Sequence, residues 1–162
     1  MLEWCRLNPW KIDLATLYNV LDLNVRVAVQ VTQAFLESMK ARWAGRIINV
    51  CSRAIWGSHE RTSYFAAKSA LVGYTHTWAL ELAEYGITVN AVAPGPVETE
   101  MFRLKHPAGS DAEKRALSSI SMKRVGRPAE VAAAIAFSLS EEAGFIIGQV
   151  LGIDEGGSLA GR

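Results

Sequence analysis

Apolar and polar residues alternate with helical or strand-like periods along most of the chain. Over residues 12–42 apolar side chains return every three or four positions, which predicts one long helix or two in tandem. A short, nearly continuous apolar run, "RIINV", begins directly after Gly45 and has the pattern of a strand covered on both faces. A second helical pattern occupies residues 62–85 and stops at Gly86, a natural C-terminal cap.

The second half of the chain continues this alternation. The run "ITVNAVAPGP" predicts a second buried strand that ends at Pro94, and "GQVLGIDEGG" predicts a third strand near the C-terminus. Between them, residues 98–123 are more polar and contain two short helical candidates, "ETEMFRL" and "SDAEKRALSSI". The segment "RPAEVAAAIAFSLS" predicts a helix with Pro128 in its first turn. Buried strands that alternate with helices predict an α/β fold with right-handed crossovers and a parallel sheet of about three strands.

Chemically useful side chains follow the predicted strands. Ligands of a parallel sheet bind outside the carboxyl ends of the strands, and Ser52 comes directly after the strand "RIINVC". Tyr64 and Lys68 lie four residues apart in the first turns of the next helix, so they share one face. The loop "PGPVET" follows the second strand. We therefore expect Ser52, Tyr64, Lys68 and this loop to converge on one crevice.

The tyrosine and the lysine suit proton transfer to a carbonyl oxygen. A free phenol has a pKa near 10, so acting as an acid or base at neutral pH requires a lowering of about three units, on the order of 4 kcal/mol. One ammonium about 4 Å away supplies roughly that much at an effective dielectric near 20. Ser52 could donate a hydrogen bond to the same oxygen, while a cofactor supplies the hydride. Taken singly, each residue also has a structural explanation: a half-buried ring, a solvated charge and a turn serine.

Composition narrows the classes of partner. The chain has 162 residues, of which 50% are hydrophobic, and its 17 basic and 16 acidic residues leave a net charge of +1. We therefore expect one compact domain over residues 1–162 and no binding to nucleic acid or membrane. No secretory signal or run of about 18 apolar residues is recognised, so a cytoplasmic protein is expected. No metal site is expected either, because the residues that could bind one show no ligand spacing: Cys5, Cys51, His59, His76 and His106.

Several motifs in order resemble the short-chain dehydrogenase/reductase family from about residue 10 to 159. "YFAAK" matches the family's YxxxK motif, "INVCS" its serine-bearing strand, and "LDLNV" its helix asparagine. "VNAVAPGPVET" resembles its nicotinamide loop, and "GRPAEVAAAIAFSLS" followed by "GQVLGIDEGG" resembles its C-terminal signature. The resemblance implies an incomplete Rossmann-like, doubly wound parallel sheet with flanking helices.

The resemblance also implies a role for each matched residue. Tyr64 would be the catalytic acid and base, Lys68 would lower its pKa and bind the nicotinamide ribose, and Ser52 would orient the substrate carbonyl. Asn24 would hold a water molecule of the proton relay. The residues that would meet the nicotinamide ring and its carboxamide are Pro94, Gly95, Val97 and Thr99.

The implied activity is that of an NAD- or NADP-dependent oxidoreductase that interconverts an alcohol and a carbonyl. Its small substrate could be a 3-oxoacyl compound, a sugar, a polyol or a steroid. Residues 98–123 would form the substrate lid, and the helices over residues 12–42 and 62–86 could join two copies in a homo-oligomer.

Two departures from the family pattern leave an alternative open. The TGxxxGxG turn, the residue that selects NAD or NADP, and the NNAG strand are not found, so the chain resembles the C-terminal half to two-thirds of such an enzyme. The third strand ends in "IDEGG" where the family usually has Asp-Gly-Gly. The alternative is an inactive truncated remnant, or an interaction module that needs a partner chain for the missing strands, because an unpaired apolar edge at "RIINV" invites pairing.

Overall fold

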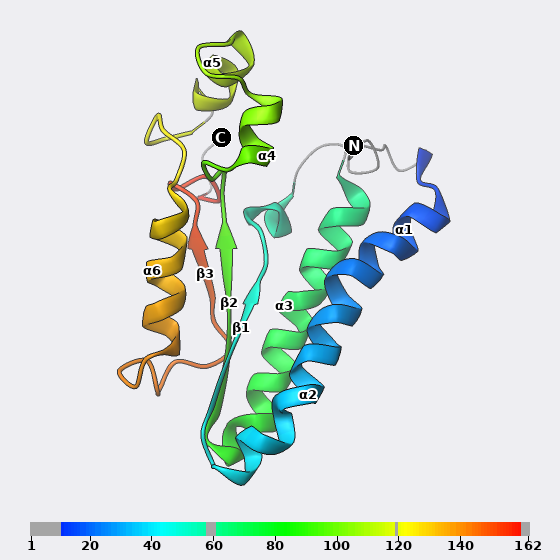
Figure 1. Ribbon diagram of the computed structural model, residues 1–162, viewed down its shortest axis with the longest axis vertical. Coiled ribbons are helices and arrows are strands. Elements are labelled where there is room, and N and C mark those ends of the chain that lie inside the picture. Colours follow the sequence, from blue (N-terminus) through cyan, green and yellow to red (C-terminus); the bar gives the residue numbers. More distant parts are fainter. Residues whose placement is uncertain (1–10, 58–60, 119, 160–162) are drawn as a thin grey trace.

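Three parallel strands form the centre of the molecule. The computed structural model describes residues 11–57, 61–118 and 120–159, and their strands pair in the order β1 (Gly45–Val50), β2 (Ile87–Pro94) and β3 (Val150–Ile153) (Figure 1). Both pairings are parallel. The predicted strands, their order along the chain and the parallel sheet are therefore confirmed.

Helices cover the two faces of this sheet. On one face lie α1 (Leu14–Leu21), a π-helical turn η3 (Asp22–Arg26), α2 (Val27–Ala41) and α3 (Thr62–Leu82) (Figure 1). The opposite face carries α6 (Pro128–Leu139), which contacts all three strands. The helix predicted over residues 12–42 is thus continuous but widens at η3. Among the helices that the structure describes, none has the length and apolar character needed to cross a membrane.

The ends of the helices follow the sequence signals. A 3-10 turn, η5 (Ala83–Tyr85), extends α3 as far as Gly86, whose φ of 68° is the left-handed conformation favoured by glycine. Pro128 begins α6, and the Glu130 carboxylate accepts a hydrogen bond from the Arg127 backbone N–H at 2.7 Å. Between β2 and α6 lie the two short predicted helices, α4 (Glu100–Lys105) and α5 (Asp111–Ser118).

The hydrophobic core is centred on β2. Seven of its eight residues are buried, because the strand is paired on both edges and covered on both faces. The side chains that face α3 form two clusters with residues of that helix, of α2 and of the end of β1: Met39, Ala79, Leu82, Ile87 and Val89 in one, and Cys51, Leu71, Ala91 and Ala93 in the other. Packing of this kind fixes which way α3 crosses the sheet.

Helices contact both faces of β1, as predicted, but the strand is less buried than its apolar run predicts. Most of β1 is only partly buried, and the Val50 residue is 49% exposed. Within the described residues β1 is an edge strand, and no further strand pairs with its open edge. The apolar run "RIINV" is typical of an interior strand of a sheet. The described residues do not supply a neighbouring strand on the open side of β1.

A buried polar pair joins β1 to α3. The Asn49 side-chain amide donates to the Thr75 hydroxyl oxygen at 2.9 Å, and that hydroxyl donates to the Leu71 carbonyl at 2.7 Å. Thr75 is fully buried and Asn49 nearly so. Because a buried donor without a partner costs about 1–3 kcal/mol, this pair favours the observed register of α3 on the sheet.

We expect Thr75→Val to lower the free energy of unfolding by about 1–3 kcal/mol, because the isosteric side chain removes the acceptor of the buried Asn49 amide. Urea unfolding followed by circular dichroism measures the change. Thr77→Val is the matched control on the exposed face of α3 and should stay within about 0.5 kcal/mol of the parent. Equal effects of the two substitutions would show that the buried pair contributes nothing specific.

Candidate active site

Ser52 lies at the carboxyl end of β1, where the chain turns into a short 3-10 helix, η4 (Arg53–Trp56). Its hydroxyl oxygen caps this turn by accepting a hydrogen bond from the Ala54 backbone N–H at 3.2 Å. A capping hydroxyl uses one lone pair in this bond, so its own proton can still be donated to another group. The cap fixes the orientation of the serine side chain and leaves its donor function available.

Tyr64 and Lys68 occupy the first two turns of α3, which packs against η4. The Lys68 ammonium lies 5.8 Å from the centre of the Tyr64 ring and donates a hydrogen bond to the Val50 carbonyl at 2.9 Å. Val50 is the last residue of β1. The structure therefore brings Ser52, Tyr64 and Lys68 to the same end of β1, as the sequence predicts.

Burial shifts the pKa values of two groups at this end of β1, the Lys68 ammonium and the Cys51 thiol. Burial lowers the pKa of the Lys68 ammonium, an effect that the nearby Cys51 thiol opposes. Burial also raises the pKa of the Cys51 thiol to about 11, so this cysteine stays protonated at neutral pH. Cys51 is a free, buried thiol, whereas Cys5 and His59 lie outside the described residues.

Asn24 lies in the π-helical turn η3, beside the same end of β1. Its side-chain amide donates to the Val20 carbonyl at 2.9 Å, which orients it along the helix. Single π-helical turns inside α-helices are frequent at functional sites. Asn24 and Lys68 line one end of a common groove, so the structure brings the predicted asparagine to the cluster.

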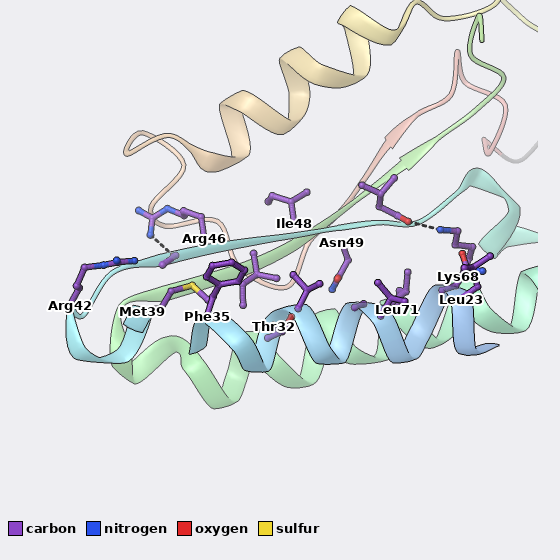
Figure 2. Close-up of a pocket in the computed structure, with 17 residues that line it drawn as sticks. Leu23, Thr32, Phe35, Met39, Arg42, Arg46, Ile48, Asn49, Lys68 and Leu71 are labelled. Atoms are coloured by element: carbon purple, nitrogen blue, oxygen red, sulfur yellow. Dashed lines mark hydrogen bonds between the residues drawn. The ribbon is translucent and has the colours of Figure 1, made fainter. Parts of the chain in front are cut away.

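This groove of about 620 Å³ runs along the open edge of β1 (Figure 2). Its floor is β1, and its wall is the apolar face of η3 and α2. Figure 2 shows Leu23 and Lys68 at one end and Arg42 and Arg46 at the other. The exposed apolar residues that line the groove are Leu23, Val27, Val31, Phe35 and Val50, each between 42% and 66% exposed.

The residues predicted to contact the nicotinamide lie at the end of β2 and in the loop after it, and they differ in their local roles. Pro94 ends β2 and Gly95 follows it, with the Gly95 N–H donating to the Ile153 carbonyl of β3 at 3.0 Å. Val97 forms an isolated parallel bridge with Gly126. Thr99 is exposed, and its hydroxyl oxygen caps α4 by accepting from the Phe102 N–H at 3.2 Å. Pro94 and Gly95 thus lie at the strand ends, whereas the Thr99 hydroxyl serves a local cap.

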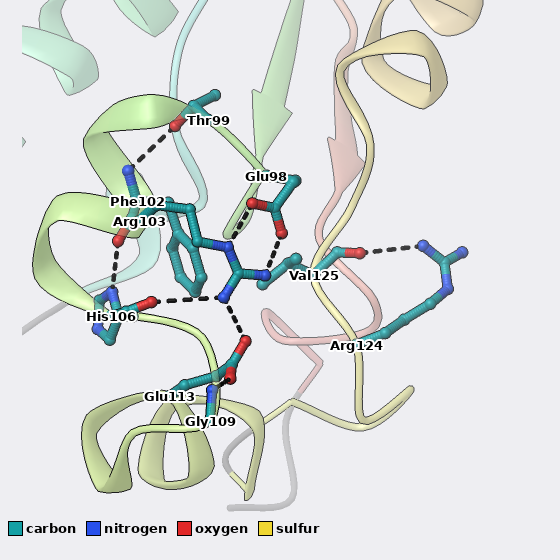
Figure 3. Close-up of polar contacts among 9 residues, drawn as sticks. All are labelled: Glu98, Thr99, Phe102, Arg103, His106, Gly109, Glu113, Arg124 and Val125. Carbon is teal, nitrogen blue, oxygen red and sulfur yellow. Dashed lines mark hydrogen bonds and ion pairs between the residues drawn. The ribbon is translucent and has the colours of Figure 1, made fainter.

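A charged network that sequence reasoning missed orders the segment after β2 (Figure 3). The Arg103 guanidinium donates two hydrogen bonds of 2.5 Å to the Glu98 carboxylate and another to Glu113 in α5. Glu113 also accepts from the Gly109 N–H at 2.6 Å. Its hydrogen bond with Arg103 is the main reason that the pKa of Glu113 lies below its usual range. Bidentate pairing of this kind joins the loop after β2, α4 and α5 into one unit.

A second missed interaction crosses the ends of all three strands. The Arg53 guanidinium, next to Ser52, donates to the Glu155 carboxylate at 2.8 Å, and the Glu155 side chain is only 7% exposed. This carboxylate lies against Gly95, because a Cβ placed on Gly95 would approach the Glu155 Oε2 atom to 2.6 Å. The two charged residues are 102 positions apart, so no local pattern could have indicated the pair.

We expect Gly95→Ala to distort the end of β2 and to lower the thermal unfolding midpoint. The added methyl group would also lie 2.9 Å from the Asp154 Cα atom, and this backbone atom cannot move as a flexible side chain can. Gly73→Ala in α3 is the control: a Cβ there meets nothing within 4 Å, and alanine favours a helix by about 1 kcal/mol. Differential scanning calorimetry should give opposite shifts, and a Gly95→Ala midpoint at or above that of the parent would contradict the packing described.

The described His, Cys, Asp and Glu side chains form no group of three or more that could hold a metal ion. The groups brought together at the strand ends are instead a hydroxyl, a phenol and an ammonium, which suit hydrogen bonding and proton transfer to a carbonyl oxygen.

Comparisons with known proteins agree on the family to which the chain is similar. A family model described as enoyl-(acyl carrier protein) reductase matches residues 8–158. A 3-oxoacyl-(acyl-carrier-protein) reductase of Thermotoga maritima is 44% identical over 138 residues, covering 85% of this chain and 55% of the relative.

Solved structures share the fold over nearly the whole chain. A 3-oxoacyl-(acyl-carrier-protein) reductase from Brucella melitensis has a TM-score of 0.88 at 30% identity, covering 96% of this chain and 58% of the other. An acetoin dehydrogenase from Enterobacter cloacae has a TM-score of 0.84 at 29% identity, covering 97% of this chain and 61% of the other. The chain therefore spans little more than half the length of the proteins it matches.

Proposed function

Because this chain belongs to the short-chain dehydrogenase/reductase family, we propose that it carries the proton-transferring half of an oxidoreductase that interconverts an alcohol and a carbonyl with NAD(H) or NADP(H). One observation supports the proposal: Ser52, Tyr64 and Lys68 lie near the carboxyl end of β1, where parallel sheets bind their ligands.

In the direction of reduction, Tyr64 would donate its phenolic proton to the substrate oxygen while the carbonyl carbon gains a hydride. Ser52 would donate a hydrogen bond to the same oxygen, since its acceptor side already caps η4. The Lys68 ammonium, 5.8 Å from the Tyr64 ring centre, would stabilise the phenolate that remains. Asn24 would hold a water molecule through which the proton is replaced. Oxidation of an alcohol reverses each transfer.

The residues present fit the nicotinamide end of the cofactor. Lys68 can donate to a ribose hydroxyl from the groove, and Pro94, Gly95, Val97 and Thr99 follow β2 at the same edge of the sheet. The nicotinamide, when bound, supplies or accepts the hydride. A TGxxxGxG turn for the pyrophosphate is not present in this sequence, so the adenosine end would be held by the N-terminal portion that the family resemblance implies.

The substrate class that we favour is a 3-oxoacyl thioester, the kind of compound that several relatives are named for. Residues 98–123 would close over it as a lid within one domain. The Arg103 network supports this role, because it makes α4 and α5 a preformed unit next to the end of β2. The helices over residues 12–42 and 62–86 remain our candidates for a homo-oligomer contact, with exposed apolar residues such as Leu14 and Leu80.

We expect Tyr64→Phe to lower kcat/KM by about 10²–10⁴-fold, the usual contribution of a positioned acid or base. The measurement is the oxidation of NADH and NADPH by a 3-oxoacyl thioester and by acetoin. The chain is assayed alone and fused behind the N-terminal portion, with its TGxxxGxG turn, of a relative. Tyr18→Phe, an exposed tyrosine of α1, is the matched control and should keep full activity. Absence of activity in both forms would refute the proposed reaction.

The open edge of β1 supports a second proposal: catalysis requires an additional strand that runs parallel to β1 in the groove. Within the described residues no strand covers this edge, while α2 overhangs it with Val27, Val31 and Phe35 between 42% and 61% exposed. A helix that leads into a strand of a parallel sheet ordinarily crosses over from a preceding parallel strand. The chain covers 55% to 58% of its relatives' length. The N-terminal portion that the family resemblance implies for the remainder is the occupant that fits this geometry, whether it is joined to this chain or supplied as a second one.

We expect the double substitution Val31→Lys and Phe35→Lys to abolish binding of the separately produced N-terminal portion, because charges on the groove wall oppose burial of an apolar strand. Isothermal titration calorimetry measures the affinity. Phe137→Lys on α6, across the sheet from the groove, should bind as the parent does. An N-terminal portion that fails to bind the parent, or that binds the double variant equally well, would contradict this second proposal.

A further inference from the structure

The ion pair between Arg53 and Glu155 bridges the two outer strands at the active end of the sheet. Arg53 begins the turn after β1, and Glu155 follows the end of β3 by two residues. Neighbouring strands are about 4.8 Å apart, so a contact from β1 to β3 must span roughly 10 Å above the end of β2. Two long side chains cover this distance, and the absence of a side chain at Gly95 leaves room for them.

The backbone at Glu155 shows that this contact has a conformational cost. Its φ of 55° is left-handed, a conformation that glycine adopts freely and other residues adopt at a penalty of about 1–2 kcal/mol. A glutamate is therefore present where glycine would be the easier residue, and its carboxylate is buried against Arg53.

The partner of Glu155 lies next to Ser52. The turn η4 is held by hydrogen bonds from the Ile55 N–H to the Ser52 carbonyl and from the Gly57 N–H to the Ala54 carbonyl, each 3.0 Å long. The Ser52 hydroxyl caps the same turn. If the Arg53 side chain is fixed, the first residue of the turn is fixed, and with it the orientation of the hydroxyl before it.

We propose that Glu155 is a positioning residue, which holds the turn that orients Ser52 through its ion pair with Arg53. The inference rests on the proposed function only for the role that it gives to Ser52. The pair ties the serine-bearing turn to the ends of β2 and β3, so that the hydroxyl keeps one orientation toward a substrate carbonyl.

The first test is amide hydrogen exchange of the 162-residue chain, which needs no activity. In Glu155→Gln and in Arg53→Met, the Ile55 and Gly57 amides should exchange at least about tenfold faster, while the amides of β2 are unchanged. Lys114→Met is the matched control, because Lys114 pairs with Asp111 at 3.4 Å on the exposed surface of α5. Unchanged exchange at Ile55 and Gly57 in the first two variants would overturn the proposal, whatever the activity of the protein.

Glu155→Gly separates positioning from stability. Glycine relieves the left-handed backbone, so the thermal midpoint should stay equal or rise, while exchange at Ile55 and Gly57 increases as in Glu155→Gln. In the form that reduces a carbonyl, kcat/KM for the carbonyl substrate should fall about tenfold, the effect of losing one charge-assisted hydrogen bond.

The two proposals fail in different ways. Faster exchange at Ile55 and Gly57 in the variants, together with a parent that has no reductase activity, would support the hold of the Arg53–Glu155 pair on η4 and refute the proposed function. A loosened turn together with unchanged kcat/KM would refute the orienting role of Glu155 while the proposed function stands.

Discussion

Parallel pairing of β2 on both of its edges is the constraint on which the site depends. It places the carboxyl ends of three strands at one edge of the sheet, so that Ser52, Gly95 and Glu155 come together from positions far apart in the chain. The crossover helix α3 begins at that edge and carries Tyr64 and Lys68 in its first turns. Every group proposed for catalysis is either at the end of one of these strands or on a helix that packs on them.

Much of this arrangement could be predicted because its signals are local. The period of apolar residues gave the strands and helices, and the left-handed Gly86 and the leading Pro128 marked helix ends. The convergence of Ser52, Tyr64 and Lys68 followed from the topology of a parallel sheet, without any contact being known. The family motifs added the asparagine of η3, which no periodicity would have singled out.

The remaining features depend on contacts that no local pattern records. The widened turn at Asn24 retains an α-helical apolar spacing, so it is invisible in the sequence. The Arg53–Glu155 pair and the Arg103 network join side chains that only the folded chain brings together. The partial exposure of β1 was mispredicted for the opposite reason: its composition suits an interior strand, whereas burial depends on which neighbours are present.

The thiol of Cys51 gives the end of β1 an intrinsic chemical reporter. It is 3% exposed, its backbone N–H is bonded to the Val92 carbonyl at 2.8 Å, and its pKa of about 11 leaves almost no thiolate at neutral pH. Alkylating reagents attack the thiolate of an accessible cysteine. Peptide mapping separates the alkylation of Cys51 from that of Cys5. The rate of Cys51 alkylation would therefore measure how often the carboxyl end of β1 opens to solvent. Such labelling would follow the closure of the site as strands or ligands are added, with no dye or tag introduced.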